Sequence, residues 1–332
     1  MNEILADRPT PFNSQAMLIA SRALSASRPA LIALLISRGT ELSGRVVHPI
    51  SFCNILFVGN FCAALFVGFW FGFGNLIRDL KGLKPKTIMG LLINGCLATL
   101  LSSLIFLGLQ YTTVTNAILL GRLGPVLFAL AGAIILREPI RRLEWVGFSL
   151  IAVGVVAITL KSSNFQINVG DALILLSTLV FAGSALVNKL LVAKAAPISV
   201  VVFSRNLLSS VIFFLIAMKF FGPNHFGDAF SGRLWIIMSI YALIVIVFAQ
   251  FLWYASLDNL DAKTVGRLTV LSPIFGILYA FFLNGERPSS LQVSTLMVVI
   301  LGVMIASLSG KKKANVKLEM VAQEAENVAS AS

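Results

Sequence analysis

The sequence predicts an all-α integral membrane protein with ten transmembrane helices, arranged as two inverted five-helix repeats. Of its 332 residues, 58% are hydrophobic and 12% are charged, whereas a soluble domain is roughly half apolar and about a quarter charged. Four stretches contain no Asp, Glu, Lys or Arg: 46–77, 87–121, 234–257 and 288–310. Each exceeds the roughly 20 residues that cross about 30 Å of hydrocarbon as a helix. The third observation is an internal repeat with a spacing of 148 residues.

Apolar segments bounded by Gly, Pro and charged residues define the individual spans. We expect them near 21–45, 50–73, 87–110, 113–136, 143–160, 169–193, 198–221, 234–256, 262–284 and 288–309. Cys53, Cys62 and Cys96 lie inside these segments, at spacings that match neither a disulfide framework nor a metal site. We therefore expect no metal and no cofactor.

Basic residues in the loops predict the orientation, because a positively charged loop resists translocation. One set of loops and termini holds fifteen Lys and Arg, and the alternate loops hold five. Both termini are therefore expected in the cytoplasm. The same reading divides the chain into a cytoplasmic segment (1–20), the first repeat (21–160), a linker (161–168), the second repeat (169–309) and a disordered cytoplasmic tail (310–332).

A shift of 148 residues aligns the two halves of the chain without a gap. Pro49-Ile50-Ser51 falls on Pro197-Ile198-Ser199, Pro125 on Pro273, Glu138 on Glu286, and Gly154 on Gly302. Because each repeat holds an odd number of spans, the second copy enters the membrane from the opposite side. Inverted repeats of this kind are typical of secondary transporters, with a solute site near the membrane midplane.

The aligned segments resemble one protein family. In the first half they read Leu123-Gly124-Pro125 and Leu136-Arg137-Glu138-Pro139, and in the second half Leu271-Ser272-Pro273 and Asn284-Gly285-Glu286-Arg287-Pro288. This pattern resembles the EamA-like, ten-helix branch of the drug/metabolite transporter superfamily, over about residues 21–309. The resemblance implies a carrier fold, and that superfamily includes carriers of metabolites, amino acids, nucleotide sugars and sugar phosphates.

Charged residues inside spans are the main candidates for solute binding, because each costs about 2.5–3.5 kcal/mol at mid-helix on insertion scales. Arg122 lies nine residues into its predicted span, between Gly121 and Gly124 and close to Pro125. A guanidinium beside such loosened backbone suits a carboxylate or a phosphate. The alternative is an Arg paired for packing. Gly121, Gly124, Pro125 and Pro273 are also expected hinge residues, with a static kink as the alternative.

Further candidates for solute binding lie elsewhere in the predicted spans. Arg38 and Glu41 share a helix face, where we expect either an internal ion pair or a switch that reorganises when solute enters. Arg205 and Arg267 either line the cytoplasmic mouth of a cavity or extend to the interface. Hydrogen bonds and stacking are expected from Thr115, Asn116, Gln250 and Tyr254, although such residues often join helices instead.

Taken together, these residues predict a secondary transporter for a small anionic or zwitterionic metabolite, working by alternating access through exchange or ion coupling. A lipid or lipid-linked sugar flippase is the alternative. An integral membrane enzyme is less favoured, because Asp258 and Asp261 have the spacing of a magnesium-diphosphate motif but no second acidic cluster. No catalytic residues and no nucleic-acid partner are expected. The sequence does not decide whether transport is coupled to a proton or another ion, or whether the chain forms a homodimer. Compact loops favour a bacterial inner membrane.

Overall fold

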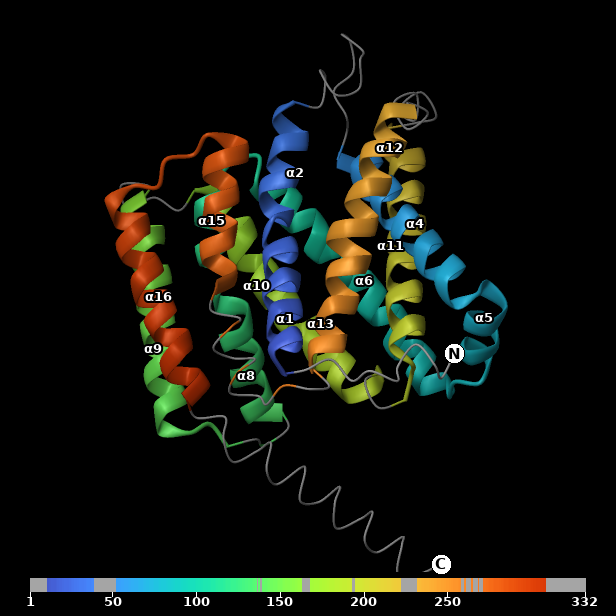
Figure 1. Cartoon of the computed structure of the whole chain (residues 1–332), viewed down its shortest axis with the longest axis horizontal. Coiled ribbons are helices and arrows are strands. Elements are labelled where there is room, and N and C mark those ends of the chain that lie inside the picture. The colour runs from blue at the N-terminus through green and yellow to red at the C-terminus, as the bar shows by residue number, and fades with distance from the viewer. Residues whose placement is uncertain are drawn as a thin grey trace, which may run out of the picture.

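The computed structural model describes residues 11–38, 52–135, 137, 139–162, 168–192, 195–221, 232–257, 260, 264, 268 and 271–308. Within these residues the chain is helical and contains no strand (Figure 1). The first half holds α1 (Pro11–Ala26), α2 (Arg28–Ser37), α4 (Phe52–Phe71), α5 (Phe73–Lys81), α6 (Pro85–Gly108), α7 (Val114–Leu120), α8 (Leu123–Ile135) and α9 (Arg142–Ser162). The second half holds α10 (Val169–Val187), η1 (Asn188–Val192), α11 (Ile198–Phe221), α12 (Gly232–Tyr241), η3 (Ala242–Phe248), α13 (Ala249–Leu257), α15 (Leu271–Asn284) and α16 (Ser290–Leu308).

Eight stretches of the described chain are long and apolar enough to cross a membrane, and a bent pair of helices makes a ninth. The fold is therefore that of a multi-pass helical membrane protein. The predicted span at 262–284 is represented by α15, which at 14 residues is short for a crossing. Most of the residues before α15 lie outside the described part of the chain, so ten spans remain a prediction.

The first span differs from its predicted position at 21–45. Its helices run over Ser14–Ser37, so it begins earlier and ends earlier than expected. The apolar run from Ala16 to Ala20 extends this helix toward the N-terminus. The hydroxyl of Ser21 donates to the carbonyl oxygen of Ala249 at 2.7 Å, so this polar residue costs little within the helix.

The second span ends in a sharp corner that the prediction at 50–73 did not include. Gly72 has a φ of +81°, a conformation that glycine adopts without steric cost. The chain there bends by 93° between the helix ending at Phe71 and α5. The helix over Phe73–Lys81 therefore leaves the direction of the span.

Helices that correspond across the two halves pack directly against each other. α4 lies along α11 and α9 lies along α16, each pair offset by 148 residues in the sequence. In the α9–α16 pair the backbones approach closely, because a Cβ added at Gly147 would lie 2.4 Å from the carbonyl oxygen of Gly302. Small residues permit such contacts between membrane helices.

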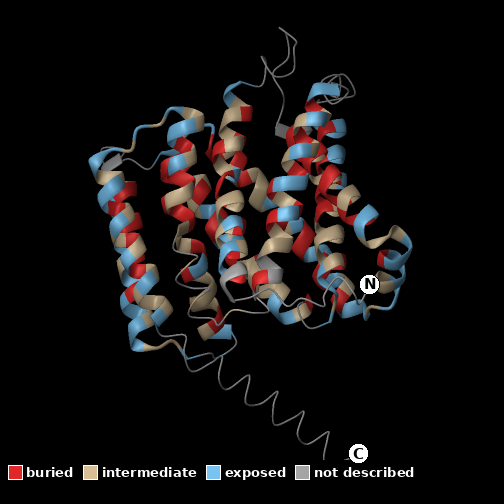
Figure 2. Cartoon of the chain, in the orientation of Figure 1, coloured by how far each residue is buried: buried red, intermediate tan, exposed pale blue. Residues whose placement is uncertain are grey.

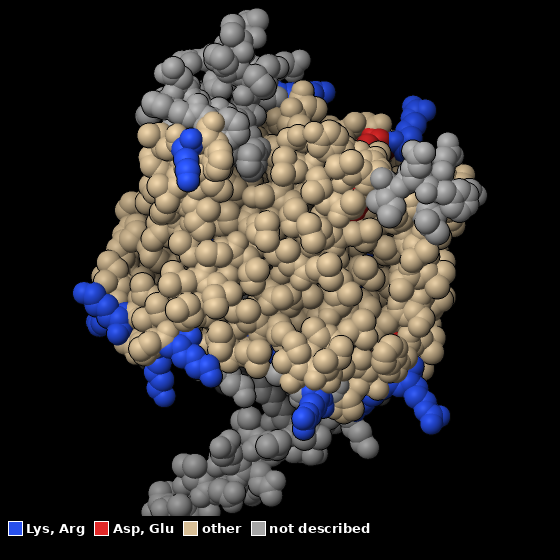
Figure 3. Space-filling model, turned by 180° about the vertical axis from the view of Figure 1, so that it is seen from behind, with Lys and Arg blue, Asp and Glu red and all other residues tan. Residues whose placement is uncertain are grey.

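The outer surface is apolar over a broad band. Large hydrophobic side chains face outward, for example Trp70 at 78% exposure and Ile134 at 79%. Figure 2 shows buried residues on the sides of helices that face their neighbours and exposed residues on the outer sides of α9 and α16. In Figure 3 the Lys and Arg side chains gather at the two ends, with an uncharged band between them. Such a surface requires lipid rather than water.

Candidate functional site

The fourth span is interrupted in the middle. α7 ends at Leu120 and α8 begins at Leu123, so Gly121 and Arg122 form the junction. The amide of Arg122 donates to the carbonyl oxygen of Leu119 at 3.1 Å, and that of Gly124 donates to Gly121 at 3.2 Å. These bonds span three residues instead of four. Pro125 has no amide hydrogen to donate to the carbonyl oxygen of Gly121, which accepts from Gly124 instead. Discontinuous helices of this kind form the solute sites of many transporters.

Arg122 lies at this junction and is half-buried. Its Nε is buried and has no hydrogen-bond partner among the described residues. Arg22 on α1 lies near enough to add electrostatic repulsion. The junction therefore presents positive charge with an unsatisfied donor, and a carboxylate or phosphate could satisfy both.

Arg22 is one of the fifteen basic residues counted above in the cytoplasmic loops and termini, whereas the structure places it inside the first span. Because the first span begins at Ser14, Arg22 lies about two turns inside a membrane helix. Its Nη2 donates to the hydroxyl of Ser21 at 3.2 Å. Arg28, at the break between α1 and α2, donates to the carbonyl oxygen of Val245 at 3.4 Å. Val245 belongs to the π-helix η3, and π-helical turns often accompany functional sites.

Glu286 fixes the start of α7. Its Oε1 accepts from the amide of Val114 at 2.7 Å, and its Oε2 accepts from the amide and the hydroxyl of Thr115 at 3.0 and 2.9 Å. The hydroxyl of Thr113 accepts from the amide of Asn116 at 3.2 Å. The first amides of α7, which lack partners within the helix, are thereby satisfied. A residue from the second half of the chain thus caps a helix of the first half.

Thr115 and Asn116, both predicted to contact solute, have protein partners in this structure. Thr115 is bound to Glu286, as given above, and Oδ1 of Asn116 accepts a hydrogen bond from Nε2 of Gln292 at 2.8 Å. Both residues are buried. Their side chains join α7 to the loop and helix that follow α15, and solute binding by them remains a prediction.

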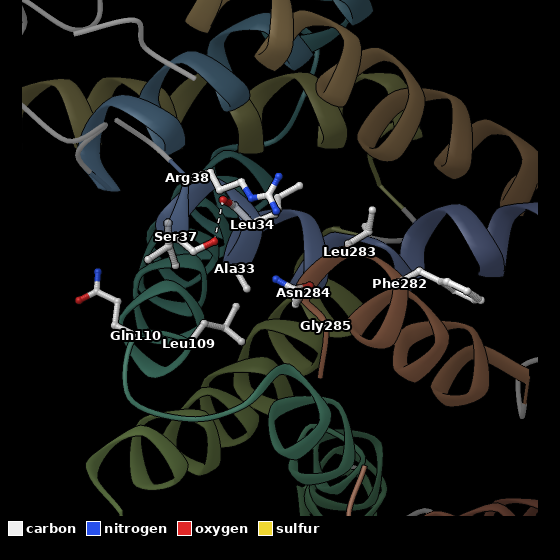
Figure 4. Close-up of a pocket in the computed structure, with 11 residues that line it drawn as sticks. Ala33, Leu34, Ser37, Arg38, Leu109, Gln110, Phe282, Leu283, Asn284 and Gly285 are labelled. Carbon is white, nitrogen blue, oxygen red and sulfur yellow. Dashed lines mark hydrogen bonds between the residues drawn. The ribbon is translucent and has the colours of Figure 1, made fainter. Parts of the chain in front are cut away.

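A cavity of about 770 Å³ opens where α2, α6 and α15 end (Figure 4). Its polar lining comes from Ser37, Arg38, Gln110 and Asn284, and its apolar lining includes Leu109 and Phe282. Figure 4 shows Asn284 turned toward α2 and Phe282 pointing away from it. The volume lies within the roughly 300–1,000 Å³ of small-molecule sites.

Asn284 also holds two helices together beside this cavity. With its amide oriented to satisfy both groups, it donates to the carbonyl oxygen of Ala30 and accepts from the amide of Leu34, each at 3.2 Å. Arg38, a predicted site residue, lines the cavity and is exposed. Arg122 does not line it.

Two other predicted residues lie on α11 and α13. Arg205 lies half-buried near the start of α11, and Gln250 lines a pocket of about 10 Å³ beside Phe71, which is too small for a solute. Pro273 is buried as the third residue of α15, matching Pro125 as the third residue of α8. Glu41, Arg267 and the side chain of Tyr254 lie outside the described residues, as does Glu138.

Sequence reasoning missed Arg22, Asn284 and Gln292. For Arg22 the available signal was the apolar run from Ala16 to Ala20, which extends the first span toward the N-terminus. Glu286 is a landmark of the internal repeat, and its hydrogen bonds place it at the start of α7. No sequence pattern pointed to Asn284 or Gln292.

Comparison with known proteins agrees with this architecture. The model of the EamA-like transporter family matches residues 30–160 and again residues 168–308. An uncharacterized transporter of Synechocystis sp. is 30% identical over 287 residues, covering 83% of this chain and 81% of that protein. The riboflavin transporter ImpX of Fusobacterium nucleatum is 25% identical over 242 residues, covering 69% of this chain and 79% of that protein. A crystal structure aligns with a TM-score of 0.58 at 19% identity, covering 90% of this chain and 98% of that chain, and supports the fold. The chain belongs to the EamA-like transporter family, and it is a multi-pass membrane transporter by that membership.

Proposed function

We propose that this protein is a secondary transporter that moves a small anionic or zwitterionic metabolite by alternating access, through exchange or ion coupling. The observation that carries the proposal is Arg122, which stands at a helix discontinuity with a buried, unpartnered Nε. Burying such a group is costly unless an opposite charge or an acceptor meets it. A solute carboxylate or phosphate at the junction would be that acceptor.

The balance of charge supports an anion. Arg22, Arg28 and Arg122 lie within or between the described membrane helices of the first half. Among the described residues near them, Glu286 is bound to α7, and Asp171 at the start of α10 accepts through Oδ1 from the hydroxyl of Thr112, in the turn before α7. The other carboxylate oxygen of Asp171 is buried without a hydrogen-bond partner in the described part of the chain. Three arginines and two carboxylates leave one positive charge in this region, which an anionic solute would offset.

The packing of the two halves supports alternating access. A shift of 148 residues makes the pair α6 and α10 correspond to the pair α13 and α1. In the structure, α6 packs against α10 and α13 packs against α1. Halves related by a twofold axis in the membrane plane can exchange conformations that open to opposite sides. With the cytoplasmic termini that the loop charges favour, the cavity beside Arg38 would open away from the cytoplasm. A bacterial inner membrane fits the composition of the loops.

Transport by the purified protein in liposomes tests this proposal. Uptake of labelled organic anions, amino acids, sugar phosphates and riboflavin would be measured with and without a proton gradient. Riboflavin belongs in the panel because one relative is named a riboflavin transporter. We expect uptake of at least one solute that carries a carboxylate or phosphate, and Arg122→Gln should weaken its binding by roughly 10- to 100-fold.

Arg142→Gln is the matched control, because Arg142 is an exposed arginine at the first position of α9. It should transport like the wild type, and Arg122→Lys should lie between the two, since it keeps the charge but loses the planar donor geometry. Wild-type uptake by Arg122→Gln would refute the role given to Arg122. Protection of labelled lipid headgroups without solute uptake would favour the flippase.

A further inference from the structure

The corner between α4 and α6 carries a short amphipathic helix, α5. Phe73, Leu76, Ile77 and Leu80 follow the i, i+3, i+4, i+7 spacing that places apolar residues on one face. Most of this face packs onto the protein: Leu76 is 2% exposed, and the ring of Phe73 meets that of Phe203 on α11 at 6.0 Å. Ile77 differs, because 47% of it is exposed. The apolar face therefore extends past the protein at one edge.

The position of α5 indicates what this edge touches. The chain turns by 93° at Gly72, and a helix of nine residues is too short to cross a bilayer. Just before the turn, Phe69 and Trp70 are 74% and 78% exposed. Exposed aromatic residues at the end of a span are typical of the membrane–water interface. The helix α5 therefore begins at the level of the lipid headgroups.

The polar side of this corner is strongly basic. Arg78, Lys81, Lys84 and Lys86 are all exposed, and Asp79, which is half-buried, is the one carboxylate between residues 73 and 86. In Figure 3 a group of Lys and Arg side chains lies at the lower left, where the half-turn from Figure 1 places α5 and the start of α6. The segment thus combines an apolar edge at the lipid interface with a net charge of about three positive units.

We propose that residues 69–86, here called the basic corner, bind the headgroups of anionic phospholipids in the adjoining leaflet. Ile77 and the exposed aromatic residues would contact the acyl boundary, and the lysines would reach the phosphates above it. Amphipathic helices with basic polar faces bind anionic membrane surfaces by this combination of apolar burial and charge. The basic corner is distinct from the proposed solute site, because residues 69–86 include neither the junction at Arg122 nor any residue that lines the cavity at Arg38.

Native mass spectrometry of the full-length protein in detergent would test the proposal. The protein would be titrated with phosphatidylglycerol and, separately, with phosphatidylcholine of the same acyl chains. We expect preferential retention of phosphatidylglycerol. The triple variant Lys81→Gln/Lys84→Gln/Lys86→Gln should weaken that retention by roughly fivefold per lysine, on the order of a hundredfold in total.

The matched control is Arg137→Gln/Arg141→Gln/Arg142→Gln, which removes three cations from another loop without an amphipathic helix of this kind. It should retain phosphatidylglycerol like the wild type. Ile77→Gln leaves every charge in place, and it should weaken retention by several-fold if the apolar edge takes part. Unchanged binding by the lysine variant, or an equal loss in the control, would overturn the proposal. Displacement of the lipid by inorganic phosphate, but not by chloride at the same ionic strength, would assign the site to free phosphate instead.

Discussion

Replacing Glu286 with alanine should destabilise the contact between the two halves of the chain at the start of α7. The carboxylate accepts three hydrogen bonds, from the amides of Val114 and Thr115 and from the hydroxyl of Thr115. Hydrogen bonds to a charged group contribute about 1.5–3 kcal/mol each when one partner is removed. Glu286 is half-buried, so water can replace part of what is lost. We therefore expect Glu286→Ala to lower the free energy of unfolding by about 2–4 kcal/mol, below the sum of three separate bonds.

Two further substitutions separate the contributions of the individual hydrogen bonds that Glu286 accepts. Glu286→Gln keeps one acceptor oxygen and should cost about half as much as the alanine variant. Thr115→Val removes the hydroxyl bond but leaves both backbone amides with their acceptor, so about 1 kcal/mol is expected. The predicted order of destabilisation is Glu286→Ala, then Glu286→Gln, then Thr115→Val.

Thermal unfolding of the purified protein in detergent, followed by tryptophan fluorescence, would measure this order. Glu144→Ala is a suitable control, because Glu144 accepts a single bond, from the amide of Arg141 at 2.9 Å, within the first half. It should lower the melting temperature less than Glu286→Ala does. If Glu286→Ala melts at the wild-type temperature, or no lower than Thr115→Val, the capping role is refuted.

Four other substitutions have definite expectations. Gly147→Ala should destabilise the protein by about 1–3 kcal/mol through the clash between α9 and α16. Gly154→Ala should lower the melting temperature less, because its new Cβ would lie 3.3 Å from a Val299 methyl group, which needs to move by only a few tenths of an ångström. Ser184→Ala removes a buried hydrogen bond, 2.6 Å long, from the hydroxyl of Ser184 to Oδ1 of Asn94. It should lower the free energy of unfolding by about 0.6–1.7 kcal/mol, the range measured for hydrogen bonds between membrane helices. An unchanged melting temperature would contradict this. Arg38→Gln should raise the solute concentration for half-maximal uptake without lowering the melting temperature, because Arg38 is exposed at the cavity. A lowered melting temperature with unchanged uptake would assign Arg38 a structural role.

The spans and their order could be predicted to within a few residues along most of the chain. α11 occupies 198–221 as expected, and α6 and α16 begin within two residues of their predicted starts. Long apolar runs bounded by charge leave few alternatives when every backbone polar group must be satisfied within lipid. The first span begins at Ser14 instead of residue 21, because the apolar run from Ala16 to Ala20 continues its helix toward the N-terminus.

The candidate site was predicted in part. Arg122 was identified from its rarity in a span, and the structure places it at the junction of α7 and α8. The roles of Thr115 and Asn116 could not be resolved from sequence, because a hydroxyl or amide can bind either solute or protein. Their partners, Glu286 and Gln292, follow more than 170 residues later in the chain.

By itself, the sequence determined that this protein is a helical membrane protein of the EamA-like family, and where most of its helices run. Those properties depend on composition and on the length of apolar runs, which are local in the chain. The tertiary structure decided that Arg22 lies near Arg122, that Glu286 caps α7, and that a cavity opens between three helix ends. These features depend on which helices pack together and on the side chains that meet there, and no local pattern encodes such distances.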